Sequence, residues 1–245
     1  MLKRAPATAV GLSLAAAPLL PATPAHADHT YVERAGVSGF SYGTQSYRTF
    51  TVWADVETED PWDTDVRYSL EPTNPDCLVF EYGELTRDYG NRFSGELVLS
   101  QSDLYGGNAC AGDWVLEVSA FDWSSGGGYT TGDRTIVRFK RQSRVVNNNA
   151  GPEPVASGGT VRVTAGLQRA SWETFRYGAL GGRSAELQFK PSGGSYSTVK
   201  TVTSSSTGHL SASVRQYRDG CYRWVFRGFS TTAASTSGGD CVDVD

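Results

Sequence analysis

The chain has 245 residues, of which 20% are charged and 11% are aromatic, with 28 glycines and 4 cysteines. This length corresponds to about two small domains. The formal net charge is −4, whereas nucleic-acid binding requires a concentrated basic face, so these values argue against a nucleic-acid-binding protein.

Residues 1–27 have the parts of a secretory signal peptide. Lys3 and Arg4 precede the apolar run AVGLSLAAAPLL, and the small residues Ala25 and Ala27 precede the expected cut. The run is too short to span a membrane, and no second long apolar segment follows. We therefore expect a secreted, extracellular protein without a membrane span that starts at Asp28. Cleavage removes two of the 22 basic residues and none of the 26 acidic ones, which leaves a net charge of −6.

The segment YRTFTVWADVE, residues 47–57, alternates between an apolar and a polar face. Its apolar positions are Phe50, Val52, Ala54 and Val56. This alternation is typical of a half-buried strand. Similar short strands are predicted at 30–39, 65–72, 77–85, 91–100, 113–123 and 134–142. Some seven strands separated by turn-rich pieces predict a β-sandwich.

An acidic stretch, WADVETEDPWDTDVRY, covers residues 53–68. Its candidate metal ligands are Asp55, Glu57, Asp60, Asp63 and Asp65. Ca²⁺ takes six to eight hard oxygens, which strand carboxylates and loop carbonyls could supply. The spacing is not that of an EF-hand, because the required Gly and terminal Glu are missing. The alternative is a solvated acidic face whose charge is balanced by Arg67, Arg87 or Arg92, and the sequence leaves both readings open.

Aromatic residues near turns suggest a second kind of ligand. Flat rings on a sandwich can stack on sugars, which would make a carbohydrate- or cell-wall-binding module. The candidates are Trp53, Trp62, Trp123 and Tyr129. Trp114 and Trp224 lie on alternating strands and are predicted to be core residues.

The four cysteines are expected to form disulfides, because an exported chain with an even cysteine count rarely keeps free thiols. Pairing Cys77 with Cys110 and Cys221 with Cys241 keeps each bridge within one half of the chain. A hairpin of the last two strands would place the second pair opposite one another. A zinc site does not fit, because no CxxC pair is present.

The Asn run and the prolines of RQSRVVNNNAGPEPVASGG suggest a break between two patterned halves. We predict an amino-terminal domain at 28–147 and a carboxy-terminal domain at 148–245. Strands of the second half are predicted at 159–169, 184–191, 197–205, 208–216, 221–228 and 241–245. Tyr222 is placed either as a tyrosine corner bonded to nearby backbone or as an ordinary packed residue. The predicted fold class is therefore all-β, with two tandem immunoglobulin-like β-sandwiches after a signal peptide.

Most of residues 148–244 resembles a domain that recurs in exported proteins of actinobacteria. The shared pattern is Pro-Glu-Pro at 152–154, Gly-Thr-Val at 159–161, Ala-x-Trp-x-Thr at 170–174, Leu-Gln-Phe at 187–189 and Val-Asp-Val at 242–244. Cys221 and Cys241 depart from it, because aromatic residues are more usual there. The first half loosely resembles the variable immunoglobulin-like domain that precedes it in such proteins. Members are often labelled calcium-binding, so the resemblance implies an extracellular protein without known catalysis and suggests Ca²⁺, but supplies no ligand residues.

The sequence shows no catalytic motif. His29 and His209 are expected to be exposed, no GxSxG elbow is present, and the glycines at 126–128 lack the Lys of a phosphate loop. The acids could cut glycosides only in a deep cleft, which two small sandwiches rarely provide. We therefore expect a secreted, non-enzymatic protein for extracellular or cell-surface interaction, whose partner is an unknown extracellular protein or a polysaccharide.

Overall fold

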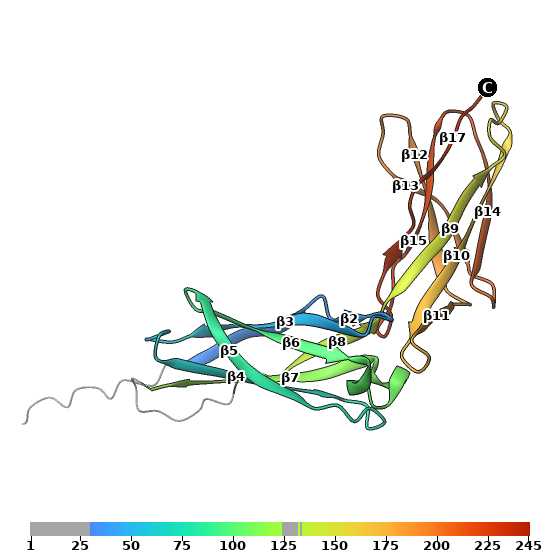
Figure 1. Ribbon diagram of the computed structural model, residues 1–245. Helices are drawn as coiled ribbons and strands as arrows, with labels where there is room; N and C mark the ends of the chain where they lie inside the picture. The colour runs from blue at the N-terminus through green and yellow to red at the C-terminus, as the bar shows by residue number, and fades with distance from the viewer. Residues whose placement is uncertain (1–29, 124–131, 133) are drawn as a thin grey trace, which may run out of the picture.

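The structure is a computed structural model that describes residues 30–123, 132 and 134–245. Figure 1 shows two elongated β-structures that follow one another along the chain and meet at a bend where β8 (Arg134–Arg141) gives way to β9 (Ser143–Gly151). Both are immunoglobulin-like sandwiches, so the predicted all-β fold class is confirmed. Within the described ranges, no helix is long and apolar enough to cross a membrane. The expected signal peptide, Asp28 and His29 lie outside these ranges.

The described residues of the amino-terminal sandwich form eight strands. They are β1 (Tyr31–Ser38), β2 (Ser41–Tyr42), β3 (Tyr47–Glu57), β4 (Thr64–Pro72), β5 (Glu81–Tyr89), β6 (Arg92–Ser100), β7 (Gly112–Asp122) and β8. Their order is β1-β3-β6-β5-β4-β7-β8-β2. The first half of β5 pairs with β4 and the second half with β6, so β5 joins the two layers. The short β2 runs parallel to the end of β8.

The core of this sandwich follows the predicted alternation. The apolar positions of β3, from Phe50 to Val56, are at most 3% exposed, and Trp114 is fully buried. Alternate residues of a strand point to opposite faces, so one apolar face is enough to specify the register of this strand. The predicted core position of Trp114 is confirmed.

The carboxy-terminal sandwich has two layers. One contains β9, β10 (Thr160–Ser171), β11 (Arg176–Ala179) and β14 (His209–Arg215). The other contains β12 (Ser184–Pro191), β13 (Ser197–Thr203), β15 (Gly220–Phe226), β16 (Ser235–Thr236) and β17 (Asp240–Val242). Trp224, Leu187 and Val161 are fully buried between the layers, so Trp224 is also a core residue, as predicted.

Both predicted disulfides are present. Cys77 is joined to Cys110, which ends the 3₁₀ turn η2 (Gly107–Cys110) after η1 (Gln101–Asp103). Cys221 and Cys241 lie directly opposite each other on β15 and β17, so their bond is the expected cross-strand disulfide.

Tyr222 is buried and anchors the turn between β14 and β15. Its hydroxyl donates to the side-chain carbonyl of Gln216, six residues upstream, and burial raises the pKa of the hydroxyl to about 12. The amide nitrogen of Gln216 in turn donates to the backbone oxygen of Arg218. A tyrosine corner normally bonds the backbone directly, whereas here the Gln216 side chain makes that connection.

The strand β9 was not predicted, since its Asn run reads as a loop. β9 pairs with β10 over most of its length, and the predicted division at residues 147 and 148 falls inside it. Asn148 donates from its amide nitrogen to the backbone oxygens of Tyr222 and Gly238, 2.9 Å each, which ties β9 to the opposite layer. Asn147 has a φ of 54°, a conformation that Asn tolerates better than most residues, close to the register shift in this pair. β9 ends before Pro152, which lacks the N–H needed to continue the ladder.

Trp172, just after β10, packs into the core of the amino-terminal sandwich. Its ring centre lies 4.6 Å from that of Phe139 and 6.1 Å from that of Tyr42. The side-chain oxygen of Asn108, in η2, accepts a hydrogen bond of 2.9 Å from the backbone nitrogen of Trp172. The two sandwiches are therefore connected by packed side chains as well as by the chain between β8 and β9. We call this contact the joint.

Candidate functional site

The loop between β3 and β4 presents a tryptophan to solvent. A carboxylate oxygen of Asp60 accepts from the backbone nitrogen of Trp62 at 2.9 Å, and the backbone oxygen of Asp60 accepts from Asp63 at 3.1 Å. Pro61 follows Asp60 and fixes its own φ, which suits the second position of such a turn. Trp62 is 82% exposed. The sequence Asp-Pro-Trp-Asp thus folds locally into a tight turn that projects an indole outward.

Arg87 of β5 covers one side of this indole. Its guanidinium carbon lies 4.1 Å from the centre of the Trp62 ring, and its Nε donates to the backbone oxygen of Gly90 at 2.8 Å. A guanidinium over a Trp face is a favourable cation–π arrangement, worth about 0.5–1 kcal/mol at an exposed site. The hydrogen bond to Gly90 holds the guanidinium in place, so the ring and the charge form an ordered pair.

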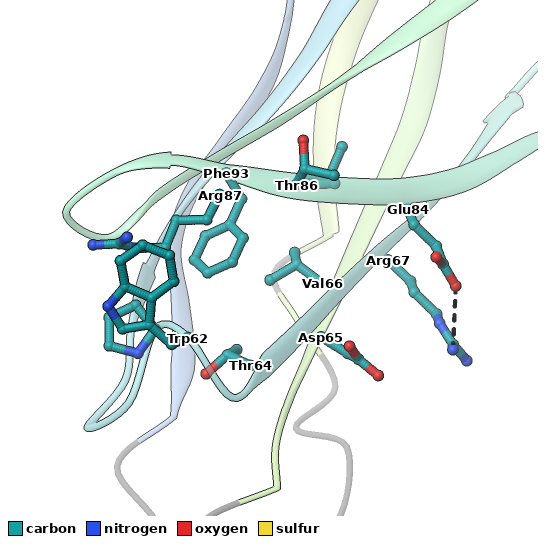
Figure 2. A pocket seen from close by; sticks show the side chains of 11 residues that line it. Trp62, Thr64, Asp65, Val66, Arg67, Glu84, Thr86, Arg87 and Phe93 are labelled. Carbon is teal, nitrogen blue, oxygen red and sulfur yellow. Dashed lines mark ion pairs between the residues drawn. The ribbon is translucent and has the colours of Figure 1, made fainter.

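A pocket of about 260 Å³ lies beside this pair, between the loop and β5. Figure 2 shows Trp62 and Arg87 at one end of the pocket and the ion pair of Arg67 with Glu84, 3.3 Å long, at the other. Val66 and Phe93 line the middle. The pocket is smaller than a typical drug-sized site of about 300–1,000 Å³, so its size suits one protein side chain or one sugar ring.

Trp123, after β7, lies at the same end of the sandwich. Its backbone nitrogen donates to the oxygen of Asp63 at 2.9 Å, and its indole nitrogen donates to the carboxylate of Asp65 at 3.0 Å. Its side chain is 57% exposed. Tyr89, the last residue of β5, is 74% exposed. We define the tip as Trp62, Arg87, Tyr89 and Trp123; Figure 1 shows that this end of the sandwich points away from the carboxy-terminal sandwich.

A buried carboxylate supports the tip from below. Asp122 is 2% exposed and accepts hydrogen bonds from the hydroxyls of Thr58 and Thr30, at 3.0 and 3.3 Å. The Thr58 hydroxyl also contacts that of Thr64 at 2.8 Å. These bonds hold both ends of the Trp62 loop against β7. Asp122 was not predicted as a functional residue, although an acid inside the apolar pattern of 113–123 was a usable signal.

The predicted metal ligands are used in other ways. Asp55 contacts two guanidinium groups: Nε and Nη2 of Arg92, the latter at 3.0 Å, and Nη2 of Arg34 at 2.6 Å. The hydrogen bonds from Arg92, followed by the other contacts with both arginines, hold the pKa of the Asp55 carboxyl below its usual value. Both carboxylate oxygens of Asp55 thus accept hydrogen bonds from guanidinium groups, and Asp55 forms structural ion pairs with Arg34 and Arg92.

The other four acids do not converge. Glu57 accepts from the amide of Asn91 at 3.4 Å, Asp60 closes its own turn, and Asp65 accepts from Trp123. Across the described ranges, which include all five predicted ligands, no group of three or more His, Cys, Asp or Glu is placed to hold a metal ion. The arrangement does not fit a Ca²⁺ cage, which needs several converging oxygens. Calcium binding, predicted from the acidic stretch and suggested by the family resemblance, stays a prediction.

The predicted carbohydrate-binding residues separate into two groups. The guanidinium carbon of Arg92 lies 4.4 Å from the centre of the Trp53 ring. The other contact of this ring is with Gly36, where an added Cβ would lie only 2.8 Å from the indole. It is therefore held in place by packing. Trp62 and Trp123 are exposed at the tip. Tyr129 lies outside the described residues.

A second exposed apolar surface was missed. Leu78, Phe80, Tyr82 and Tyr105 are 60–77% exposed, and the backbone nitrogen of Leu78 donates to Tyr105 at 2.8 Å. The segment 77–85 was predicted as one strand, whereas β5 begins at Glu81. The alternation of that segment already placed Leu78, Phe80 and Tyr82 on one face. His209, as expected, is exposed.

The strand order and the two-layer packing define the protein as an immunoglobulin-like β-sandwich protein. No protein-family model matches the chain, and no curated protein does. Solved structures with some similarity include the Yersinia pseudotuberculosis adhesin InvE, with 9% identity over 89% of this chain and a TM-score of 0.29. This chain spans 59% of that InvE chain.

Two further solved structures are similar at the same level. A marsupial T cell receptor has 12% identity over 87% of this chain and 73% of its own, with a TM-score of 0.35. The D0-D1 domain of intimin has 10% identity over 86% of this chain and 98% of its own, with a TM-score of 0.30. These scores are low, so the assignment of the fold rests on the strands of this chain, and the site has to be interpreted from its own residues.

Proposed function

We propose that this protein is secreted, has no enzymatic activity and binds a macromolecular partner outside the cell through the tip. The observation that carries the proposal is the exposed Trp62, ordered by Asp60 and Arg87 beside a small pocket. Trp, Tyr and Arg are the residues most enriched among those that dominate binding energy at protein interfaces. The tip contains all three types.

The Trp62 turn and Arg87 of the tip are held in fixed conformations, which favours a role in binding. Partners that order their side chains on binding lose free energy, about 0.5–1.5 kcal/mol for each flexible side chain. The Trp62 turn and the Arg87 guanidinium are already fixed by hydrogen bonds. A partner side chain that enters the pocket would therefore meet a preformed surface.

Two features support an extracellular location. Disulfides persist mainly in oxidising compartments, and this chain has two, with no free cysteine among its described residues. Residues 1–27 have the pattern of a cleaved signal peptide.

A polysaccharide is the second candidate partner, favoured by two exposed indoles, Trp62 and Trp123, at one end of the sandwich. Sugars stack on open aromatic faces, and Arg87 already covers one face of Trp62. A protein partner is therefore the better fit at Trp62, whereas Trp123 keeps the carbohydrate reading open.

The experiment compares binding of the fluorescently labelled mature chain to the producing cells and to their purified wall polysaccharide. Trp62→Ala and Arg87→Gln should each weaken binding at least tenfold. Tyr217→Ala is the matched control, because Tyr217 is 70% exposed on the carboxy-terminal sandwich. Protease treatment of the cells distinguishes the two partners, since it abolishes binding only to a protein. Equal binding by all variants would refute a role of the tip.

A further inference from the structure

Arg141, the last residue of β8, lies at the joint with its side chain buried. It is 8% exposed. Its backbone is satisfied, because its nitrogen donates to Thr231 at 3.1 Å and its oxygen accepts from Ala233 at 2.9 Å. Its side-chain Nε is fully buried and has no hydrogen-bond partner. A buried N–H without a hydrogen-bond partner is unfavourable, so this Nε–H calls for a compensating acceptor.

A second guanidinium approaches the same place from β10. Nη1 of Arg169 donates to the hydroxyl of Thr232 at 3.2 Å, and Thr232 is fully buried. Thr232 also pairs with Arg141 in a parallel bridge. Arg141 of β8 thus pairs with this buried threonine through the backbone, and Arg169 of β10 bonds its hydroxyl.

No described carboxylate neutralises these two groups. None lies within the 4.0 Å of an ion pair with Arg141 or Arg169. Burial, and then the positive charge of Arg169, lowers the pKa of Arg141 to about 10, and the exposed Glu173 opposes this only in part. Burial and the nearby Arg183 likewise lower the pKa of Arg169.

We propose that a tetrahedral oxyanion, of the phosphate or sulfate type, binds at the joint between Arg141 and Arg169. The planar guanidinium offers adjacent Nε–H and Nη–H donors that match two oxygens of one anion, and the Arg141 Nε is free to make such a bond. The hydroxyl of Thr232, which accepts from Arg169, can supply another polar contact. This site is independent of the tip.

The anion would act as a bridge between the two sandwiches. Arg141 belongs to β8 of the amino-terminal sandwich, and Arg169 belongs to β10 of the carboxy-terminal one. An anion held by both contacts the two sandwiches at once. Binding should therefore stabilise the joint by mass action and remove the repulsion between the two guanidinium groups.

The test is isothermal titration calorimetry of the mature chain with sodium phosphate and, separately, sodium sulfate at pH 7. The protein is first dialysed into an oxyanion-free buffer of matched ionic strength. Arg141→Met keeps a long stem without the charge, and Arg169→Gln removes the second group. Arg162→Gln is the matched control, because Arg162 is an exposed arginine on the same strand as Arg169.

We expect one saturable site in the unmodified chain and in Arg162→Gln, with dissociation constants within twofold of each other. Arg141→Met and Arg169→Gln should each weaken binding at least tenfold. Circular dichroism checks that each variant folds. If Arg141→Met does not fold, binding by Arg169→Gln decides the question. No saturable heat with either anion, or equal binding by the folded variants, would show an adventitious ion only and overturn the proposal.

Discussion

The indole nitrogen of Trp172 donates a hydrogen bond to the backbone oxygen of Tyr42, 3.1 Å away. Trp172 follows a strand of the carboxy-terminal sandwich, yet it is 1% exposed and belongs to the hydrophobic core of the amino-terminal one. The core of the first sandwich is therefore completed by the second. This dependence makes the joint a structural contact instead of a free hinge.

Replacing Trp172 with Ala should destabilise the amino-terminal sandwich by about 3–5 kcal/mol, the usual cost of truncating a buried aromatic residue. The variant loses the ring contacts with Phe139 and Tyr42 as well as the hydrogen bond. Chemical denaturation of the mature chain measures the change. Trp62→Ala controls for the substitution itself, because it removes only an exposed ring and its cation–π pair with Arg87, worth about 0.5–1 kcal/mol. A loss below about 1 kcal/mol at Trp172 would contradict the role of the joint.

The Cys77–Cys110 disulfide should stabilise the amino-terminal sandwich. Its sequence separation is 33 residues, for which the chain-entropy model gives about 4 kcal/mol. The bridge also holds η2, whose Asn108 bonds Trp172. Changing both cysteines to Ser should therefore lower Tm and also increase hydrogen exchange at the Trp172 amide. An unchanged exchange rate at the Trp172 amide would show that the disulfide does not stabilise the joint.

Asp55→Asn should cost about 1–3 kcal/mol, because it weakens charge-assisted hydrogen bonds to two arginines. The pKa of Asp55 is lowered in the folded state. Its stabilisation is therefore complete above the unfolded value of about 3.9 and is lost as the pH falls through the lower folded value. The difference in unfolding free energy between the two proteins should be constant from about pH 5 to 8 and shrink in more acidic solution. Asp63→Asn is the matched control, and a difference that grew on acidification would contradict the ion pair.

Calcium should have little effect on the amino-terminal sandwich. Asp55 is occupied by Arg34 and Arg92, and the remaining acids do not converge. Thermal unfolding in millimolar Ca²⁺, in Mg²⁺ and in chelator should give Tm values within about 1 °C, below the several degrees that a specific site would add to a small domain. A rise with Ca²⁺ alone that Asp60→Asn and Asp63→Asn abolish would restore the predicted metal site.

The elements that the sequence predicted are those in which local pattern and burial agree. Strand β3 could be found because one face is wholly apolar, and the cysteine pairs because each closes a loop within one half of the chain. β9 could not, since Asn148 is stabilised by the backbone oxygens of Tyr222 and Gly238, which are distant in sequence and which no local pattern reveals. Arg92 was named as one residue that could balance the acidic stretch, whereas the part of Arg34 in pairing with Asp55 was missed, because strand register brings these residues together. Trp62 could be named from its turn, but its order depends on Arg87 of another strand.

Hydrogen exchange of the mature chain, with and without the producing cells or their wall polysaccharide, tests whether the tip is the binding surface. We expect slower exchange on binding in the loop of Trp62 and in β5 around Arg87, and no change in the carboxy-terminal sandwich. Trp62→Ala should remove this protection and leave the exchange of the unbound protein unchanged elsewhere. Protection confined to Leu78–Tyr82 or to the carboxy-terminal sandwich would place the partner on another surface and contradict the account.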